Sequence, residues 1–230
     1  MPSPAPSYSA RAPSIRTGMQ FALLIPILIF SVVLHEVAHA WVARREGDDT
    51  ADRLGRITLN PFPHLDLMGS VIVPTVLYLL PTSFLFGWAK PVPVDPRNYR
   101  DPKWSDVRVS LAGIAINLLL AALLTVAGAL LARYGTGAWV DVAGEAIMLG
   151  IFLNLILAIF NLIPVPPLDG GHVAYHFLPH GFRDRYRAFG KYGIIAIFGF
   201  LFLVPGGIRI LLYPVEVLLF ASMAFIQVWM

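Results

Sequence analysis

The chain has 230 residues, of which 57% are hydrophobic and 13% are charged. Soluble domains average roughly 25% charged residues, so this composition, with a mean hydropathy of +0.70, excludes an ordinary soluble domain. The net charge is +3, no basic patch is interleaved with aromatic residues, and cysteine is absent. We therefore expect an all-α polytopic membrane protein that binds no nucleic acid and has no disulfide or thiolate metal ligand.

Proline and serine dominate residues 1–18, which we expect to form a disordered N-terminal lead. A basic lead before an apolar run also begins a signal peptide. The run that starts at Met19 extends to about Val42, however, which is longer than the roughly 7–15 residues of a signal sequence. No small-residue cleavage site follows it. We therefore interpret the run as part of the folded protein.

Six apolar stretches predict about five to six transmembrane or re-entrant segments. They comprise residues 19–43, 67–88, 110–132, 145–168, 192–205 and 208–229. A crossing needs about 20 apolar residues, and the first, third and fourth stretches satisfy this well. The second contains Pro74 and Pro81, and the fifth is short and ends at Pro205-Gly206-Gly207.

The connectors between these stretches differ in charge. Lys and Arg are abundant in residues 43–66, 90–108 and 180–191, whereas 133–144 carries only Arg133. The positive-inside rule then places the three basic connectors in the cytoplasm and 133–144 outside. Because 43–66 and 90–108 would share a side, we expect 67–88 to enter the membrane and return. The alternative is an ordinary crossing that breaks the rule once.

The first basic connector contains a β-prone run, Leu54-Gly55-Arg56-Ile57-Thr58-Leu59, closed by Asn60-Pro61. It predicts a short β-strand or hairpin element near the active site, whose edge could pair with an extended peptide. A surface loop is the alternative interpretation.

The pattern H-E-x-x-H occurs at His35, Glu36 and His39, inside a run from 19 to 42 that has no other ionisable residue. Titratable groups in a membrane span are expensive and therefore indicate function. Positions i and i+4 share one face of a helix, so both imidazoles can bind one metal while the glutamate points toward its bound water. This spacing is typical of zinc hydrolases.

Catalytic zinc usually has three protein ligands and one open position, so the two histidines require a third ligand. Prolines at 164, 166 and 167 are expected to unwind the end of the stretch 145–168, directly before Asp169. An acid at such a depth needs a cation partner, and the histidine pair needs an acid. We therefore predict that Asp169 completes the site.

These paired motifs resemble the site-2 protease family of intramembrane zinc proteases. The family's second motif, N-x-x-P-x-x-x-L-D-G, is matched by Asn161, Pro164, Leu168, Asp169 and Gly170. Ala112-Gly113 to Asn117 is similar to a helix start in the family, with Ile114 where proline is usual. Residues 59–66 and 87–94 resemble the compact branch that lacks PDZ and CBS domains. The likeness covers roughly residues 20–230.

The resemblance implies a role for each matched residue. His35, His39 and Asp169 would bind one Zn²⁺ per chain, and Glu36 would act as general base and then protonate the leaving amine. Asn161 would hold the substrate strand or help the oxyanion, unless it only bonds a neighbouring helix. His172 and Asp66 are the best candidates for outer hydrogen bonds to the ligands.

We therefore expect residues 19–230 to form one intramembrane metalloprotease domain, with a catalytic core at about 19–172. Its substrates would be single-span membrane proteins or remnant signal peptides, cut within or near the bilayer to release cytoplasmic fragments. Arg44 and Arg45 place the site toward the cytoplasmic side of a multi-pass protein in a bacterial plasma membrane. Two alternatives are a divalent-cation transporter or channel, for which Asp169 is the only candidate acid, and an inactive scaffold, against which Glu36 argues.

Overall fold

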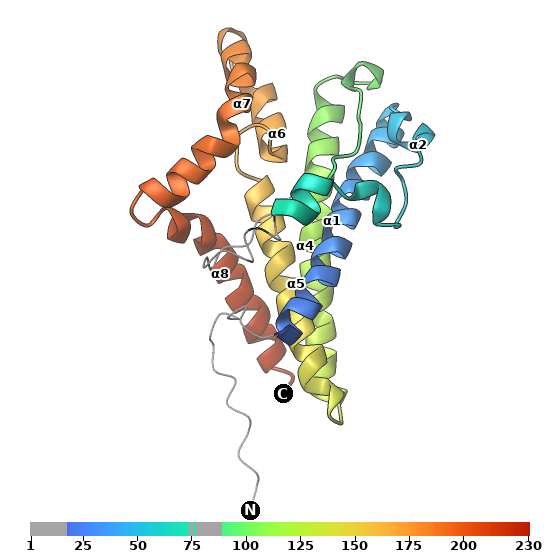
Figure 1. The fold of residues 1–230 in the computed structure, drawn as a ribbon, viewed down its shortest axis with the longest axis vertical. Helices are drawn as coiled ribbons and strands as arrows, with labels where there is room; N and C mark the ends of the chain where they lie inside the picture. The colour runs from blue at the N-terminus through green and yellow to red at the C-terminus, as the bar shows by residue number, and fades with distance from the viewer. Residues whose placement is uncertain (1–17, 74–75, 77–88) are drawn as a thin grey trace, which may run out of the picture.

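Figure 1 shows a computed structural model of the chain, which describes residues 18–73, 76 and 89–230. Residues 1–17 of the lead predicted at 1–18 and most of the stretch 67–88 therefore lie outside the described residues, and Gly18 is the first residue of α1. The helices are α1 (Gly18–Glu46), α2 (Thr50–Arg53), α4 (Trp104–Tyr134), α5 (Trp139–Asn161), α6 (Asp169–Phe177), α7 (His180–Leu203) and α8 (Gly207–Gln227). Short 3-10 turns occur at Phe62–His64 and Pro96–Asn98, and a π-helical turn at Leu67–Ile72.

Five of the described helices, α1, α4, α5, α7 and α8, are long and apolar enough to cross a membrane. This confirms the prediction of an all-helical, multi-pass membrane protein. The helices generally extend a few residues beyond the predicted stretches, and two differences in their bounds are informative. α5 ends at Asn161 instead of about 168, because Pro164 and the prolines after it cannot continue a helix. α7 begins at His180 instead of 192, so the third basic connector is helical.

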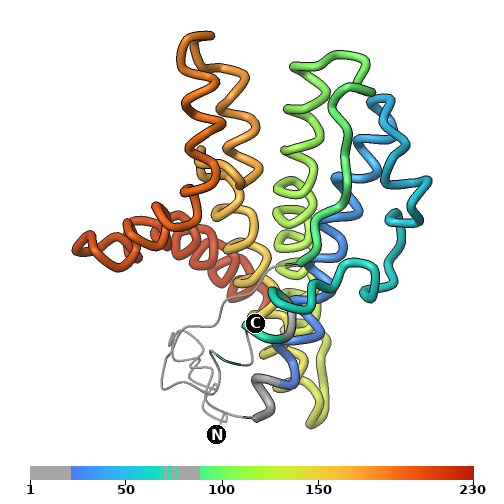
Figure 2. Tube along the Cα trace, turned by 45° about the horizontal axis from the view of Figure 1, so that its top comes forward, coloured from blue at the N-terminus to red at the C-terminus, as the bar shows by residue number. Residues whose placement is uncertain are grey.

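α1, α4 and α5 lie side by side in both views of the molecule (Figures 1 and 2), and α4 also packs against α6 and α8. One buried cluster joins α4, α5 and α8. Its members are Ala121, Ala129, Ile151, Leu155, Val215 and Ile226. Small side chains such as these alanines let membrane helices approach closely. The core of the bundle therefore sits around α4.

The turn between α4 and α5 lies at one end of the molecule, and the connectors around α2 and α6 lie at the other (Figure 1). Residues 43–66 and 90–108 also bond directly, because Arg100 N–H donates to the Glu46 carbonyl and Lys90 N–H to the His64 carbonyl. The two connectors therefore share one end of the molecule. The re-entry predicted for 67–88 falls mostly on residues 74–75 and 77–88, which lie outside the described part of the chain.

The strand predicted at 54–59 is wrong. These residues form a turn followed by bends, and the described parts of the chain contain no strand. The local reason is that Arg56 folds back: its N–H donates to the Ala51 carbonyl, and its buried guanidinium donates to the Lys90 and Pro91 carbonyls. These contacts hold the backbone in a compact loop, which β propensity alone does not prevent.

Asp48 organises the junction between the two connectors. Its side chain is fully buried and accepts hydrogen bonds from Thr50, from the Asn98 amide (2.9 Å) and from Asp95 N–H (2.7 Å). Burial by itself raises the pKa of this carboxyl, but the hydrogen bonds from Asn98 and Thr50 outweigh it, so the pKa lies below its ordinary value. Asp48 is therefore an anion at neutral pH, and it stabilises the junction between residues 43–66 and 90–108.

Candidate metal centre

α1 presents His35 and His39 one turn apart on the face that meets α4. Both side chains are buried, and their Nε2 atoms lie 3.0 Å from each other. The arrangement follows from the helical period, because residues four apart lie above one another. The predicted pairing of the two imidazoles is therefore present.

Asp169 reaches the same point from a different part of the chain. After α5 ends, residues 162–168 form a non-helical loop, and Asp169 is the first residue of α6. A carboxylate in the first turn of a helix is favoured by the helix dipole. The loop packs tightly on α6: a Cβ on Gly170 would lie 2.3 Å from the Leu162 carbonyl oxygen, and one on Gly171 would lie 2.5 Å from Pro166 N. Only glycine permits this approach.

The three side chains form a compact set of metal-binding donors. Asp169 Oδ2 lies 3.3 Å from Nε2 of His35 and 3.3 Å from Nε2 of His39. This oxygen is buried and has no hydrogen-bond partner among the described residues. A buried polar atom without a partner is costly, and a cation between the three donors would satisfy it.

The spacing of these donors suits zinc. Ligand atoms about 2.0–2.1 Å from a tetrahedral zinc lie about 3.3 Å apart, close to the separations of 3.0, 3.3 and 3.3 Å between the three donors. Nitrogen and carboxylate donors are also the ligand types expected for catalytic zinc in a chain without cysteine. The residues present therefore fit the metal.

The other ring nitrogen of each histidine has a buried partner. His35 Nδ1 lies 2.6 Å from Asn117 Oδ1, and His39 Nδ1 lies 2.7 Å from the Val109 carbonyl oxygen, both on α4. Such bonds orient metal-binding imidazoles and set their tautomers. The sequence analysis proposed His172 and Asp66 for this task, whereas the described partners of the two Nδ1 atoms are Asn117 and Val109. His172 instead lies near Asp106, and the Asp66 side chain accepts from Gly69 N–H.

α4 also makes room for the metal centre at Gly113. A Cβ at this position would lie 2.4 Å from His39 Nε2 and 2.6 Å from His35 Nε2. Any side chain here would occupy the space between the donor atoms. The A-G-x-x-x-N pattern at 112–117 therefore has a physical basis that the sequence did not reveal, because Gly113 and Asn117 face the site one turn apart.

Glu36 lies beside the two histidines on α1, where its Oε2 accepts a hydrogen bond of 2.8 Å from Val92 N–H. The two residues before Val92 are held through their carbonyls by Arg56. The connector thus fixes the rotation of the Glu36 carboxylate. This support depends on tertiary contacts across more than fifty residues, so no local sequence signal indicates it.

The remaining sequence candidates lie elsewhere. Asn161 is the last residue of α5, and its side-chain amide donates to the Leu157 carbonyl of its own helix. His176 donates to Asp106 on α4 at 2.7 Å, so it ties α6 to α4. His64 is buried in the connector and its Nε2 lies 3.0 Å from the Thr58 carbonyl oxygen. Among the described contacts, none of these side chains touches the three donor groups of His35, His39 and Asp169.

Comparisons with known proteins agree with this geometry. The model of Peptidase family M50 matches residues 23–143 and 135–205. YwhC of Bacillus subtilis (strain 168), provisionally named a zinc metalloprotease, is 40% identical over 191 residues, which cover 82% of this chain and 83% of YwhC. Rip2 of Mycolicibacterium smegmatis, also provisionally named so, is 34% identical over 168 residues, covering 69% of this chain and 59% of Rip2.

A more distant relative is the zinc metalloprotease MJ0392 of Methanocaldococcus jannaschii, which is 24% identical over 154 residues, or 66% of this chain and 33% of MJ0392. No solved structure matches the chain significantly. Nothing in these findings supports the transporter or scaffold alternatives. The chain belongs to Peptidase family M50, and it is a multi-pass, zinc-dependent metalloprotease of the site-2 protease type.

Proposed function

We propose that His35, His39 and Asp169 hold the catalytic zinc and that Glu36 is the general base of peptide hydrolysis. The convergence of two Nε2 atoms and one unpartnered carboxylate oxygen, each pair 3.0–3.3 Å apart, carries this proposal. Zinc held there lowers the pKa of a bound water to about 7 and polarises the scissile carbonyl.

Glu36 is placed to handle the proton. Its Oε2 is occupied by Val92 N–H, so we assign proton transfer to Oε1. The carboxylate takes a proton from the attacking water and returns it to the amide nitrogen as that nitrogen leaves. Because the Val92 bond fixes the carboxylate in one orientation, the base need not search for its geometry during the reaction.

Asn161 is proposed to contact the substrate near the scissile bond. It ends α5 and begins the loop that leads to Asp169, so substrate chain extending from the metal centre passes close to it. To donate to a substrate carbonyl, its amide must exchange the Leu157 carbonyl for that oxygen. This exchange is local, since it needs only a side-chain rotation at a helix end.

The active site lies inside the membrane, close to the connector end. His35 and His39 precede Arg44 on α1, at about 14 and 8 Å along the helix axis. Site-2 proteases act on membrane-protein substrates within the bilayer. A transmembrane helix hides its amides in internal hydrogen bonds, so the substrate must unwind to reach the metal. We propose single-span proteins or remnant signal peptides as substrates of this one-domain enzyme, residues 19–230.

The proposed orientation follows from charge. The three basic connectors occupy one end of the molecule, which the positive-inside rule assigns to the cytoplasm. Bacterial relatives such as YwhC support a location in the bacterial plasma membrane. With the metal centre near the connector end, cleavage releases a cytoplasmic fragment.

Reconstitution with defined substrates tests the proposal. The protein is placed in liposomes with model single-span proteins that carry a Gly-Pro pair in the cytoplasmic half of the span, and cleavage is followed by gel and mass spectrometry. Glu36→Gln should lower the cleavage rate about 10²–10⁴-fold while zinc content stays at the wild-type level. Glu216→Gln, an exposed glutamate of the apolar helix α8, is the matched control. Zinc-dependent cleavage that survives Glu36→Gln contradicts the mechanism.

A further inference from the structure

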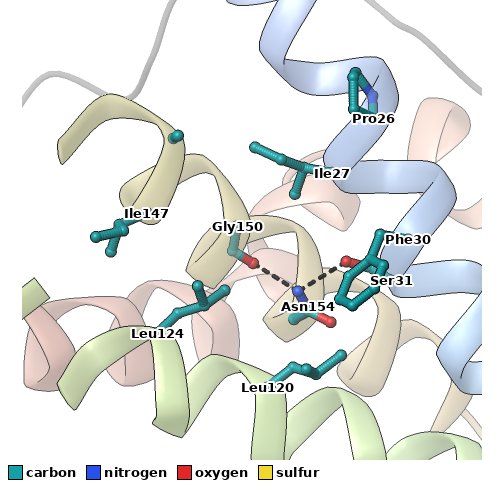
Figure 3. Close-up of a pocket in the computed structure, with 10 residues that line it drawn as sticks. Pro26, Ile27, Phe30, Ser31, Leu120, Leu124, Ile147, Gly150 and Asn154 are labelled. Atoms are coloured by element: carbon teal, nitrogen blue, oxygen red, sulfur yellow. Dashed lines mark hydrogen bonds between the residues drawn. The ribbon is translucent and has the colours of Figure 1, made fainter. Parts of the chain in front are cut away.

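A buried chain of amides leads from α5 to the metal centre. The Asn154 side-chain amide donates to the Gly150 carbonyl and the Ser31 hydroxyl, each at 2.9 Å (Figure 3). Its Oδ1 accepts from the Asn117 amide at 2.8 Å, and Asn117 Oδ1 meets His35 Nδ1 at 2.6 Å. Asn117 and Asn154 are 0% and 1% exposed, so water cannot replace these bonds.

The direction of this chain is fixed at its far end. A backbone carbonyl can only accept, so the group of Asn154 that faces Gly150 must be its NH₂. Asn154 then presents Oδ1 to Asn117, which must answer with its own NH₂. Asn117 therefore presents Oδ1 to His35, and His35 Nδ1 must carry the proton. The lone pair of His35 is left on Nε2, the atom that faces His39 and Asp169.

We propose that Asn154 is a positioning residue of the zinc site, which through Asn117 holds His35 in the tautomer that binds metal at Nε2. His39 needs no such relay, because the Val109 carbonyl, an obligate acceptor, meets its Nδ1 directly. The inference rests on the proposed ligand set. It gives Asn154 a task that none of the sequence motifs assigns to it.

The surroundings of Asn154 show why an amide there needs a reason. It lines an apolar cavity of about 330 Å³ between α1, α4 and α5, whose other walls include Ile27, Leu124 and Ile147 (Figure 3). A polar side chain in such surroundings is costly unless it is fully bonded. Asparagine can simply join membrane helices. If Asn154 had only a structural role, however, the effect of replacing it on zinc affinity would not depend on which residue accepts the Nδ1 proton of His35.

That difference defines the experiment. Zinc affinity of the purified full-length protein in nanodiscs is measured by chelator competition for four forms: wild type, Asn154→Leu, Asn117→Asp and the double variant. Asn154→Leu should weaken zinc binding about 10–100-fold, the usual cost of losing an outer hydrogen bond to a ligand. In the Asn117→Asp background, Asn154→Leu should weaken zinc binding less than about threefold. A carboxylate can only accept a hydrogen bond, so Asp at position 117 would fix the His35 tautomer without help from α5.

Thr125→Val is the matched control. Thr125 is also buried on α4, and its hydroxyl bonds only the Ala121 carbonyl of its own helix among the described residues. It should leave zinc affinity and the visible spectrum of the cobalt-substituted protein unchanged, whereas Asn154→Leu should alter both. This spectrum reports the ligand geometry, which a loss of packing elsewhere would not move.

Each outcome is decisive. Equal losses of affinity in both backgrounds, no loss in either, or failure of Asn154→Leu to fold in both would overturn the relay. Folding or zinc retention rescued by Asn117→Asp supports it. If the wild type binds zinc and Asp169→Ala does not weaken zinc binding, the proposed ligand set is wrong, and the proposed role of Asn154 fails with it. If Asp169→Ala weakens zinc binding but Asn154→Leu is silent, the relay alone fails.

Discussion

Gly113→Ala should weaken zinc binding although it replaces none of the proposed ligands. The added Cβ would lie 2.4 Å from His39 Nε2, 2.5 Å from His35 Cε1 and 2.6 Å from His35 Nε2. Ordinary contacts between such atoms are about 3.5–4.0 Å, so each imidazole would have to retreat by about 1 Å. Neither can do so freely, because the Nδ1 atoms are bonded to Asn117 and the Val109 carbonyl.

The magnitude follows from those bonds. Breaking one buried hydrogen bond costs about 1–3 kcal/mol, and each 1.4 kcal/mol is a factor of about ten in affinity. Displacing one imidazole should therefore lower zinc affinity by about 5–150-fold, and displacing both by more. α4 itself should remain folded, since alanine is a better helix former than glycine by about 1 kcal/mol.

Zinc affinity is measured by chelator competition, and helix content by circular dichroism. Gly199→Ala is the control, because a Cβ at this position of α7 meets nothing within 4 Å. If Gly113→Ala keeps zinc affinity within about threefold of the wild type, the reasoning from close packing is refuted.

Three further predictions concern the connectors and the metal. Asp48→Asn should lower the free energy of unfolding at pH 7 by about 1–3 kcal/mol, because an NH₂ group would then face donors such as Asp95 N–H. Folding lowers the pKa of Asp48, so the stability that its carboxylate contributes is present above the unfolded-state pKa of about 3.9 and is lost as the pH falls below that value. Thermal unfolding at pH 7 and pH 3 should therefore show a smaller stability difference between the wild type and Asp48→Asn in acid. Arg56→Ala should reduce cleavage about tenfold at unchanged zinc content, measured side by side, because it releases the backbone whose N–H holds Glu36; a matching loss of zinc would contradict this. Removing zinc with 1,10-phenanthroline should lower the Tm of the wild type but not of Asp169→Ala, because a ligand bound only to the folded state stabilises it; equal Tm shifts would refute the ligand assignment.

The parts of the site that lie close together in sequence were predictable. His35, Glu36 and His39 lie within five consecutive residues of one helix. Their relative geometry is therefore set by the 3.6-residue period of any α-helix. The prolines after Asn161 likewise predict a broken helix end wherever the segment packs. Hydrophobic runs of sufficient length similarly indicate spans, because the bilayer core imposes its thickness on every crossing.

Only the tertiary structure decided what surrounds these residues. The outer partners of the histidines are an amide and a carbonyl of α4, and the support of Glu36 comes from the backbone at Val92. Residues 54–59, predicted as a strand, form a loop because the Arg56 guanidinium donates hydrogen bonds to carbonyls more than thirty residues away. The sequence alone indicated the long apolar helices and predicted His35, His39 and Asp169 as metal donors, because helix spacing and the cost of charge in a membrane can be evaluated without the fold. The packing of the helices decided the partners of the histidine Nδ1 atoms, the space at Gly113 and the orientation of the Glu36 carboxylate, because hydrogen bonds between distant segments carry no signature in either partner alone.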